Sequence, residues 1–150
     1  MRKSFISILI MLISIFQAYG QNNTQSEIVE YFINKAVSLL GETVPDGFRR
    51  VDRTTFANNE DIIIITEDEK IVISYIGSIF NTTHEAHELN GLLYDYFENR
   101  GNNWSFVSST DNGTDLYFRD DIYAGISSPS RRDDGLIVTG VGFSRKIHDF

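Results

Sequence analysis

The 150-residue chain has 13 basic and 21 acidic side chains, a net charge of −8, and no cysteine. Proteins bind nucleic acids through clustered lysine and arginine that release counterions from the phosphates. This acidic chain, whose basic residues are scattered, is therefore not expected to bind nucleic acid, and it can form no disulfide.

The first twenty residues have the pattern of a secretory signal peptide. Arg2 and Lys3 precede an apolar run over residues 5–16, and a cut after Gly20 leaves small side chains at −3 and −1. A bilayer-spanning helix needs about 20 apolar residues, so this shorter run favours cleavage, with an uncleaved N-terminal anchor as the alternative. Cleavage removes two basic side chains and no acidic one, so the net charge changes from −8 to −10.

Export predicts a mature chain that begins at or near Gln21. Mass spectrometry of the protein from its own host should find this N-terminus in the periplasm or outside the cell, with no membrane attachment. A chain that keeps Met1 and stays in the soluble cytoplasmic fraction would contradict export.

In the first half of the mature chain, the spacing of apolar residues predicts a helix over residues 26–40. Thr24 and Glu27 form a possible capping box at its start. A short extended piece near residues 48–52 follows, and then a hairpin of residues 62–66 and 71–80. The isoleucine run of this hairpin does not alternate with polar residues, which indicates a strand covered on both faces or one buried in an oligomer contact.

The second half predicts a helix over residues 83–99 and four strands over residues 104–110, 114–120, 122–128 and 136–145. Asn112-Gly113, between the first two strands, is the strongest short hairpin signal. We therefore expect residues 21–150 to form a single α+β domain. Its antiparallel sheet would have about six or seven strands, with two helices packed on one side, in the order helix, strands, helix, four strands. Each half begins with a helix, but no residue-level similarity indicates a repeat.

Two of the three histidines lie in the sequence TTHEAHE at residues 82–88. His84 and Glu88 have the four-residue separation of the ligands in H-E-x-x-H, and His87 could join them. Helical rotation puts all three on the polar face of the second helix, which supplies neither the dry pocket nor the open position of a catalytic zinc site. Thr82 and Glu85 fit a capping box. We therefore predict a capped, solvated helix face, with no metal or cofactor.

Other catalytic motifs are not found in the sequence. There is no G-x-S-x-G elbow, no phosphate-binding loop and no cysteine nucleophile. Gly140 and Gly142 lie within a predicted strand, where glycine marks a bulge or a close backbone approach. Acidic pairs at 60–61, 120–121 and 133–134 fall in turns and at strand ends, where solvated charge is usual. A carboxylate-dependent hydrolase of envelope or extracellular polymers is the enzymatic alternative.

The register of the last four strands decides which side chains share a face. A two-residue loop at Asn112-Gly113 pairs Phe106 with Arg119 and Val107 with Phe118. In the last hairpin, alternation predicts an apolar core face and an opposite face that includes Tyr123. We place five residues on the face that the helices leave open: Trp104, Phe106, Tyr117, Arg119 and Tyr123.

This open face is the candidate ligand-binding site. Aromatic rings beside one cation suit a peptide, a glycan or a protein partner, because they offer large apolar areas with fixed polar tips. A homodimer contact would use the same features. The alternatives are that cross-strand aromatic pairs only stabilise an exposed sheet, or that a helix covers this face. We expect an exported binding protein without chemistry of its own.

Overall fold

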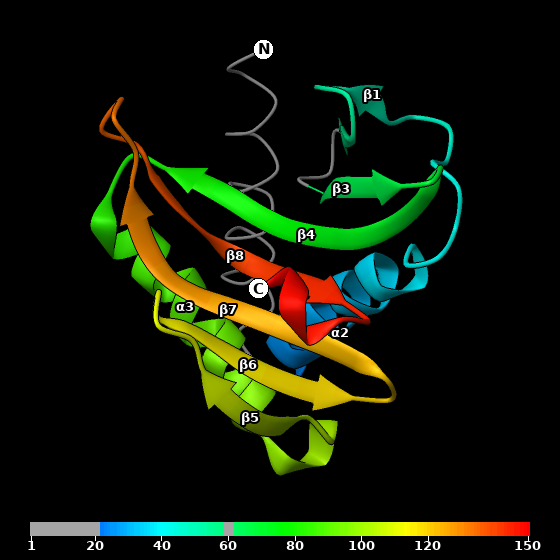
Figure 1. Cartoon of the computed structure of the whole chain (residues 1–150). Helices are drawn as coiled ribbons and strands as arrows, with labels where there is room; N and C mark the ends of the chain where they lie inside the picture. Colours follow the sequence, from blue (N-terminus) through cyan, green and yellow to red (C-terminus); the bar gives the residue numbers. More distant parts are fainter. Residues whose placement is uncertain (1–21, 59–61) are drawn as a thin grey trace.

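The computed structural model describes residues 22–58 and 62–150, and the predicted signal peptide lies outside these residues. Two helices, α2 (Asn22–Ser38) and α3 (Thr83–Glu98), lie on one side of an eight-stranded antiparallel sheet (Figure 1). The predicted α+β class is confirmed, with more strands than expected. Among the described residues, no helix is long and apolar enough to span a bilayer.

The eight strands form two groups of four, each preceded by a helix. The first group is β1 (Arg49–Arg50), β2 (Thr55–Ala57), β3 (Ile62–Glu67) and β4 (Lys70–Phe80). The second is β5 (Ser105–Ser109), β6 (Thr114–Arg119), β7 (Ile122–Arg131) and β8 (Ile137–Ser144), and short 3-10 turns η1 (Arg100–Asn102) and η2 (Ile147–Asp149) precede and follow it. The sheet order β1-β2-β3-β4-β8-β7-β6-β5 makes β4 and β8 the central pair, so each half runs from an edge of the sheet to its centre.

The first helix differs from its predicted bounds at its start. It begins at Asn22, four residues before the predicted Ser26, so Thr24 lies within α2 and not before its first residue. At the start of α3, the predicted cap is confirmed: the Thr82 side chain accepts a hydrogen bond from the backbone N–H of Glu85 at 3.3 Å. The Glu85 carboxylate accepts from the Thr82 hydroxyl at 2.9 Å.

The core lies between the two helices and one face of the sheet. In the last hairpin, Ala124 pairs with Phe143 and Ile126 with Val141, and all four side chains are fully buried beneath the helices. The predicted core face of this hairpin is therefore confirmed.

The isoleucine run of β3 alternates in burial, although its sequence does not alternate in polarity. Ile62 and Ile64 are fully buried on the helix face, whereas Ile63 is 37% exposed on the other. Coverage on both faces is therefore wrong for β3, but its hairpin partner β4 is a central strand whose residues 71–77 are all buried or half-buried, as the first of the two explanations predicts for at least one strand. A contact with a second molecule at Ile63 stays a prediction.

Glycines on the face of the sheet that points away from the helices allow close packing at the centre of the sheet. An added Cβ at Gly140 would lie 2.2 Å from the carbonyl oxygen of Ile76 on the neighbouring β4. At Gly125 of β7, it would lie 2.5 Å from the ring of Phe150, which folds back over the sheet after η2. The close backbone approach expected of a strand glycine is confirmed at Gly140.

The predicted register of the β5–β6 hairpin is wrong. Thr110 donates its backbone N–H to the carbonyl of Thr114 at 2.8 Å, and Gly113 has a φ of +82°. The loop therefore has three residues ending in a left-handed glycine, which is the next most common hairpin after the two-residue type. A bulge at Val107 shifts the register once more, so that Phe106 pairs with Tyr117. A shift of one residue exchanges the two faces of a strand, and a second shift exchanges them back, so Phe106 and Tyr117 still share a face, as predicted.

Candidate functional site

The turn between β6 and β7 decides which face of the sheet carries the predicted site. Asp120 and Asp121 have φ values of +50° and +65°, as the two central residues of a type I′ hairpin do. This turn pairs Tyr117 with Ala124, whose side chain lies in the core. The predicted residues of β6 therefore lie under the helices, and the expectation that they face an open side of the sheet is wrong.

Trp104 and Tyr117 are core residues, with 7% and 3% of their surfaces exposed. The ring of Phe97 from α3 packs against both, with centroid distances of 4.9 Å to Trp104 and 5.2 Å to Tyr117. Phe106 is 59% exposed, and its ring forms a T-shaped pair with the Tyr117 ring, with the two centroids 5.7 Å apart. Tyr123 lies on the opposite face, against Phe118 at 4.9 Å, so the structure does not bring it to the other four.

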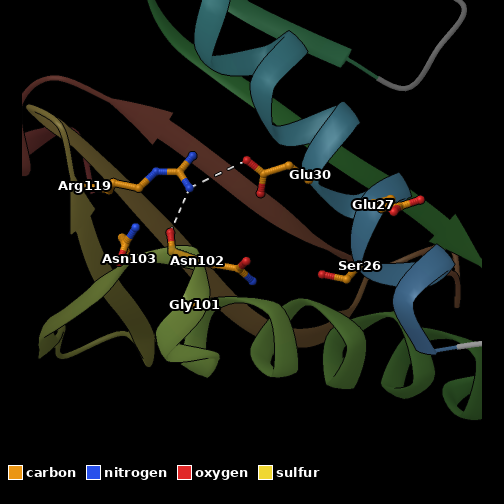
Figure 2. A pocket seen from close by; sticks show the side chains of 7 residues that line it. All are labelled: Ser26, Glu27, Glu30, Gly101, Asn102, Asn103 and Arg119. Carbon is orange, nitrogen blue, oxygen red and sulfur yellow. Dashed lines mark hydrogen bonds and ion pairs between the residues drawn. The ribbon is translucent and has the colours of Figure 1, made fainter.

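Arg119 joins three elements on the helix side of the sheet (Figure 2). Its guanidinium lies 4.4 Å from the centroid of the Trp104 ring. Its Nη1 donates to the carbonyl of Asn102 in η1 at 2.9 Å and lies 3.8 Å from a carboxylate oxygen of Glu30 in α2. A carbonyl, a carboxylate and an aromatic ring of the protein itself thus surround the positive charge of Arg119, which indicates a structural role for this residue.

The cleft beside Arg119 has a volume of about 580 Å³ and lies between α2 and η1. Figure 2 shows its lining, which is mainly polar and comprises Ser26, Glu27, Glu30, Gly101, Asn102, Asn103 and Arg119. No aromatic ring lines it, so of the five predicted residues this cleft includes Arg119 alone.

A second cavity, of about 380 Å³, brings three of the predicted residues together. It lies where the end of α3 and η1 meet β5 and β6, and we name it the Trp104 cavity. Its lining comprises Phe97, Glu98, Arg100, Trp104, Phe106, Ser109, Asp115 and Tyr117. The combination of four aromatic rings with two carboxylates and one arginine makes it the best candidate site in the part of the chain that the structure describes.

Hydrogen bonds fix one of the two carboxylates in place. Asp115 accepts from the hydroxyl of Tyr94 at 2.8 Å through Oδ2 and from the hydroxyl of Ser109 at 2.5 Å through Oδ1. Burial, together with the negative charges of Glu98 and Asp115, raises the pKa of Tyr117 to about 12. Burial and the hydrogen bond to Asp115 also raise the pKa of Tyr94 above its ordinary value. Both tyrosines are therefore neutral at physiological pH, and the charged side chains of the cavity lining are the two acidic residues Glu98 and Asp115 and the basic Arg100.

Trp104 also contributes a polar atom without a partner. Its Nε1 is the one buried side-chain nitrogen or oxygen that has no hydrogen-bond partner within residues 22–58 and 62–150. Leaving a buried donor unpaired costs about 1–3 kcal/mol. Buried groups of this kind are uncommon, and each calls for an explanation, which can be functional.

The histidine sequence at the start of α3 lies far along the helix from the Trp104 cavity. His84 Nε2 lies 3.3 Å from Glu88 Oε1, and both side chains are largely exposed. The predicted solvated face is therefore confirmed for this pair. No group of three or more potential metal-binding side chains is found among the residues that the structure covers.

Sequence reasoning missed the polar residues of the Trp104 cavity. Asp115 is two residues from Tyr117 in the same strand, so alternation alone places both on one face. Glu98 and Arg100 follow the last apolar turn of α3 and carry no comparable signal.

Comparisons of the chain with protein-family models, with curated proteins and with solved structures find no match. Fold and cavity together define an α+β protein with an aromatic and acidic cavity near one edge of its sheet.

Proposed function

We propose that this is an exported, non-catalytic binding protein that recognises an extended segment of a protein partner at the Trp104 cavity. The cavity supports this function most directly, because it joins a rigid aromatic wall to an exposed ring at the mouth, Phe106. Aromatic residues in well-packed pockets supply most of the binding energy at protein interfaces. A volume of about 380 Å³ suits one or two side chains.

The sheet edge beside the cavity supports a peptide ligand. β5 is the last strand of the sheet, and all five of its residues are exposed. Its sequence, SFVSS, has no charged residue, whereas the opposite edge strand β1 consists of Arg49 and Arg50. Charged side chains are a common means of preventing a sheet edge from pairing, and β5 lacks them. The bulge at Val107 interrupts regular pairing, so only a short segment can align with β5.

A peptide beside β5 would combine two kinds of contact. Its backbone would bond to the free edge, and one of its alternate side chains would enter the Trp104 cavity, as in domains that bind peptides by adding a strand. A glycan on the aromatic rings, or a second copy of the chain paired along β5, would use the same surface. The test below distinguishes these occupants.

The purified chain should bind a subset of arrayed 12-residue peptides and no arrayed glycan. Phe106→Ala should weaken the binding of these peptides about tenfold, which corresponds to the loss of about 1.4 kcal/mol at an aromatic contact. Val107→Ala is the matched control, because Val107 lies next to Phe106 on the same exposed strand but does not line the cavity. This control should change the affinity less than about twofold.

Three results would contradict the proposal. Binding to glycans alone would show a sugar-binding protein. Equal effects of Phe106→Ala and Val107→Ala would place the peptide site elsewhere. A stable dimer in analytical ultracentrifugation that Phe106→Ala dissociates would show that β5 is covered by a second copy of the chain.

A further inference from the structure

Charge distinguishes the Trp104 cavity from its neighbouring cleft. In that cleft, the carboxylate of Glu30 faces the guanidinium of Arg119 at 3.8 Å. In the Trp104 cavity, neither Glu98 nor Asp115 has an ion-pair partner within the described part of the chain. The third charged residue of the lining, Arg100, is exposed and does not pair with either carboxylate. The cavity therefore has an excess of negative charge that the protein itself does not balance.

We infer that the side chain bound in the Trp104 cavity is cationic, a lysine or an arginine of the partner. This inference rests on the proposed function and adds the chemical class of the ligand. The Asp115 carboxylate already accepts hydrogen bonds from Tyr94 and Ser109, which hold it in a fixed position. It needs no reorganisation to receive a cation, which favours binding.

The aromatic walls of the cavity suit the same ligand. A cation binds the face of an aromatic ring through the ring quadrupole, and one such contact already exists here, since Arg119 lies 4.4 Å from the centroid of the Trp104 ring. Phe106 and Tyr117 present further rings on the cavity side. The apolar stem of a lysine or arginine would pack on these rings while its charged end meets the carboxylates.

The backbone of a peptide could also supply the hydrogen-bond acceptor that Trp104 Nε1 lacks. The indole Nε1 is buried and has no partner among the described residues. An indole N–H only donates hydrogen bonds, so a carbonyl oxygen can pair with it and a cation cannot. A peptide carries such an acceptor next to every side chain. A ligand carbonyl that reached this donor would satisfy it, whereas an ammonium group has no lone pair with which to accept a hydrogen bond.

Arg100 provides a test in which a cationic and an anionic ligand give opposite results. For a cation, Glu98 attracts and Arg100 repels, so Glu98→Gln should weaken binding and Arg100→Gln should strengthen it. For an anion, both effects reverse. Glu98 and Arg100 are both exposed near the end of α3, so neither substitution is expected to disturb folding.

The probes are capped pentapeptides with two glycines on each side of a central lysine, leucine or glutamate. Trp104 is the only tryptophan, so its fluorescence reports on this cavity during titration, with two-dimensional NMR as a second measurement. The lysine peptide should bind at least about tenfold more tightly than the other two, because only its side chain can pair with the carboxylates of Glu98 and Asp115. Its affinity should fall several-fold between about 50 mM and 500 mM NaCl, because salt screens charge.

The variants are then measured with the lysine peptide. Glu98→Gln and Asp115→Asn should each weaken its binding about threefold to tenfold, and Arg100→Gln should tighten it about twofold or more. Asp95→Asn is the control, because Asp95 is an exposed carboxylate of α3 that does not line the cavity, and it should change the affinity less than about twofold.

The outcomes separate this inference from the proposed function. Equal affinity for the lysine and leucine peptides, or tighter binding in Glu98→Gln, would overturn the cationic ligand. If arrayed peptides still bind in a Phe106-dependent way, the proposed function stands and only the inference fails. If no peptide binds in either experiment, both fail.

Discussion

Replacing Trp104 by alanine should lower the free energy of unfolding by about 3–5 kcal/mol, as large-to-small changes in aromatic core residues do. Trp104 is 7% exposed and packs against the rings of Phe97 and Phe143, at 4.9 and 6.2 Å. Its loss would also remove the surface on which Arg119 lies. Urea denaturation followed by far-UV circular dichroism measures the change, since the variant has no tryptophan fluorescence.

Two matched variants show whether the burial of Trp104 is the cause of this loss of stability. Phe106→Ala removes a ring from the same cavity, but Phe106 is 59% exposed, so the cost should stay below about 1 kcal/mol. Trp104→Phe keeps a ring and removes the unpaired N–H, so it should cost clearly less than alanine. In the unmodified chain, iodide should quench the Trp104 fluorescence weakly. Strong quenching together with a small cost of Trp104→Ala would contradict the core position.

The secondary structure could be predicted from the sequence because its patterns are local. Helical spacing of apolar residues located α3 to within one residue of its bounds, and period-two alternation gave the core face of the β7–β8 hairpin. Alternation is a reliable guide there, since every second residue of β7 from Ile122 to Ile126 is apolar and buried. The mirrored arrangement of the two halves in the sheet has no such local signal. It depends on the order of the helices and strands along the chain, and the two halves can share this order without sharing similar residues.

The register of β5–β6 could not be predicted from the Asn112-Gly113 signal. An asparagine before a glycine fits a two-residue loop, but it also fits a three-residue loop in which Gly113 alone is left-handed. The hydroxyl of Thr110 bonds to the Asn112 side chain and receives the N–H of Thr114 at 3.1 Å, which stabilises the longer loop. The bulge at Val107 has no sequence signature at all.

The error about the open face had a different origin, and the sequence contained the means to avoid it. Arg119 and Ile122 are separated by Asp120 and Asp121, and aspartate tolerates the left-handed conformations that a two-residue turn requires. Such a turn pairs Arg119 with Ile122 and so places Tyr117 on the same face as Ala124. Extending the alternation of the last hairpin across this turn would have placed Tyr117 and Arg119 in the core.

The composition of the Trp104 cavity depends on tertiary packing. Alternation along β6 can bring Asp115 and Tyr117 to one face, but the distance between β6 and the end of α3 is set by how the helix crosses the sheet. Glu98 and Arg100 therefore join the cavity through the packing of Phe97 against Trp104 and Tyr117. The sequence identified the aromatic residues, and alternation could have added Asp115, but nothing in the sequence places Glu98 and Arg100 beside them.

Gly140→Ala should lower the free energy of unfolding by about 2–3 kcal/mol, a typical cost of overpacking. The new methyl group would lie 2.2 Å from the carbonyl oxygen of Ile76 and 2.7 Å from Cα of Gly77. Both atoms belong to the backbone of β4, at the centre of the sheet, so β4 and β8 would have to move apart. This cost exceeds the gain of about 0.5–1 kcal/mol that alanine brings over glycine within a strand.

Gly125→Ala is the matched control, because its methyl group would meet a side chain instead of backbone. The nearest atom is in the ring of Phe150, at 2.5 Å. Rotation of Phe150 relieves the shortest contacts, so Gly125→Ala should cost less than Gly140→Ala. Adding Phe150→Ala should remove them and leave only a contact of 3.1 Å with Cγ2 of Thr114. At Gly140, the hydroxyl of Tyr75 is also close, at 2.6 Å, but Tyr75→Phe should give no rescue, since Ile76 stays in place. Rescue of Gly140→Ala by Tyr75→Phe would show that the side chain, and not the approach of the two central strands, is the reason for glycine at this position.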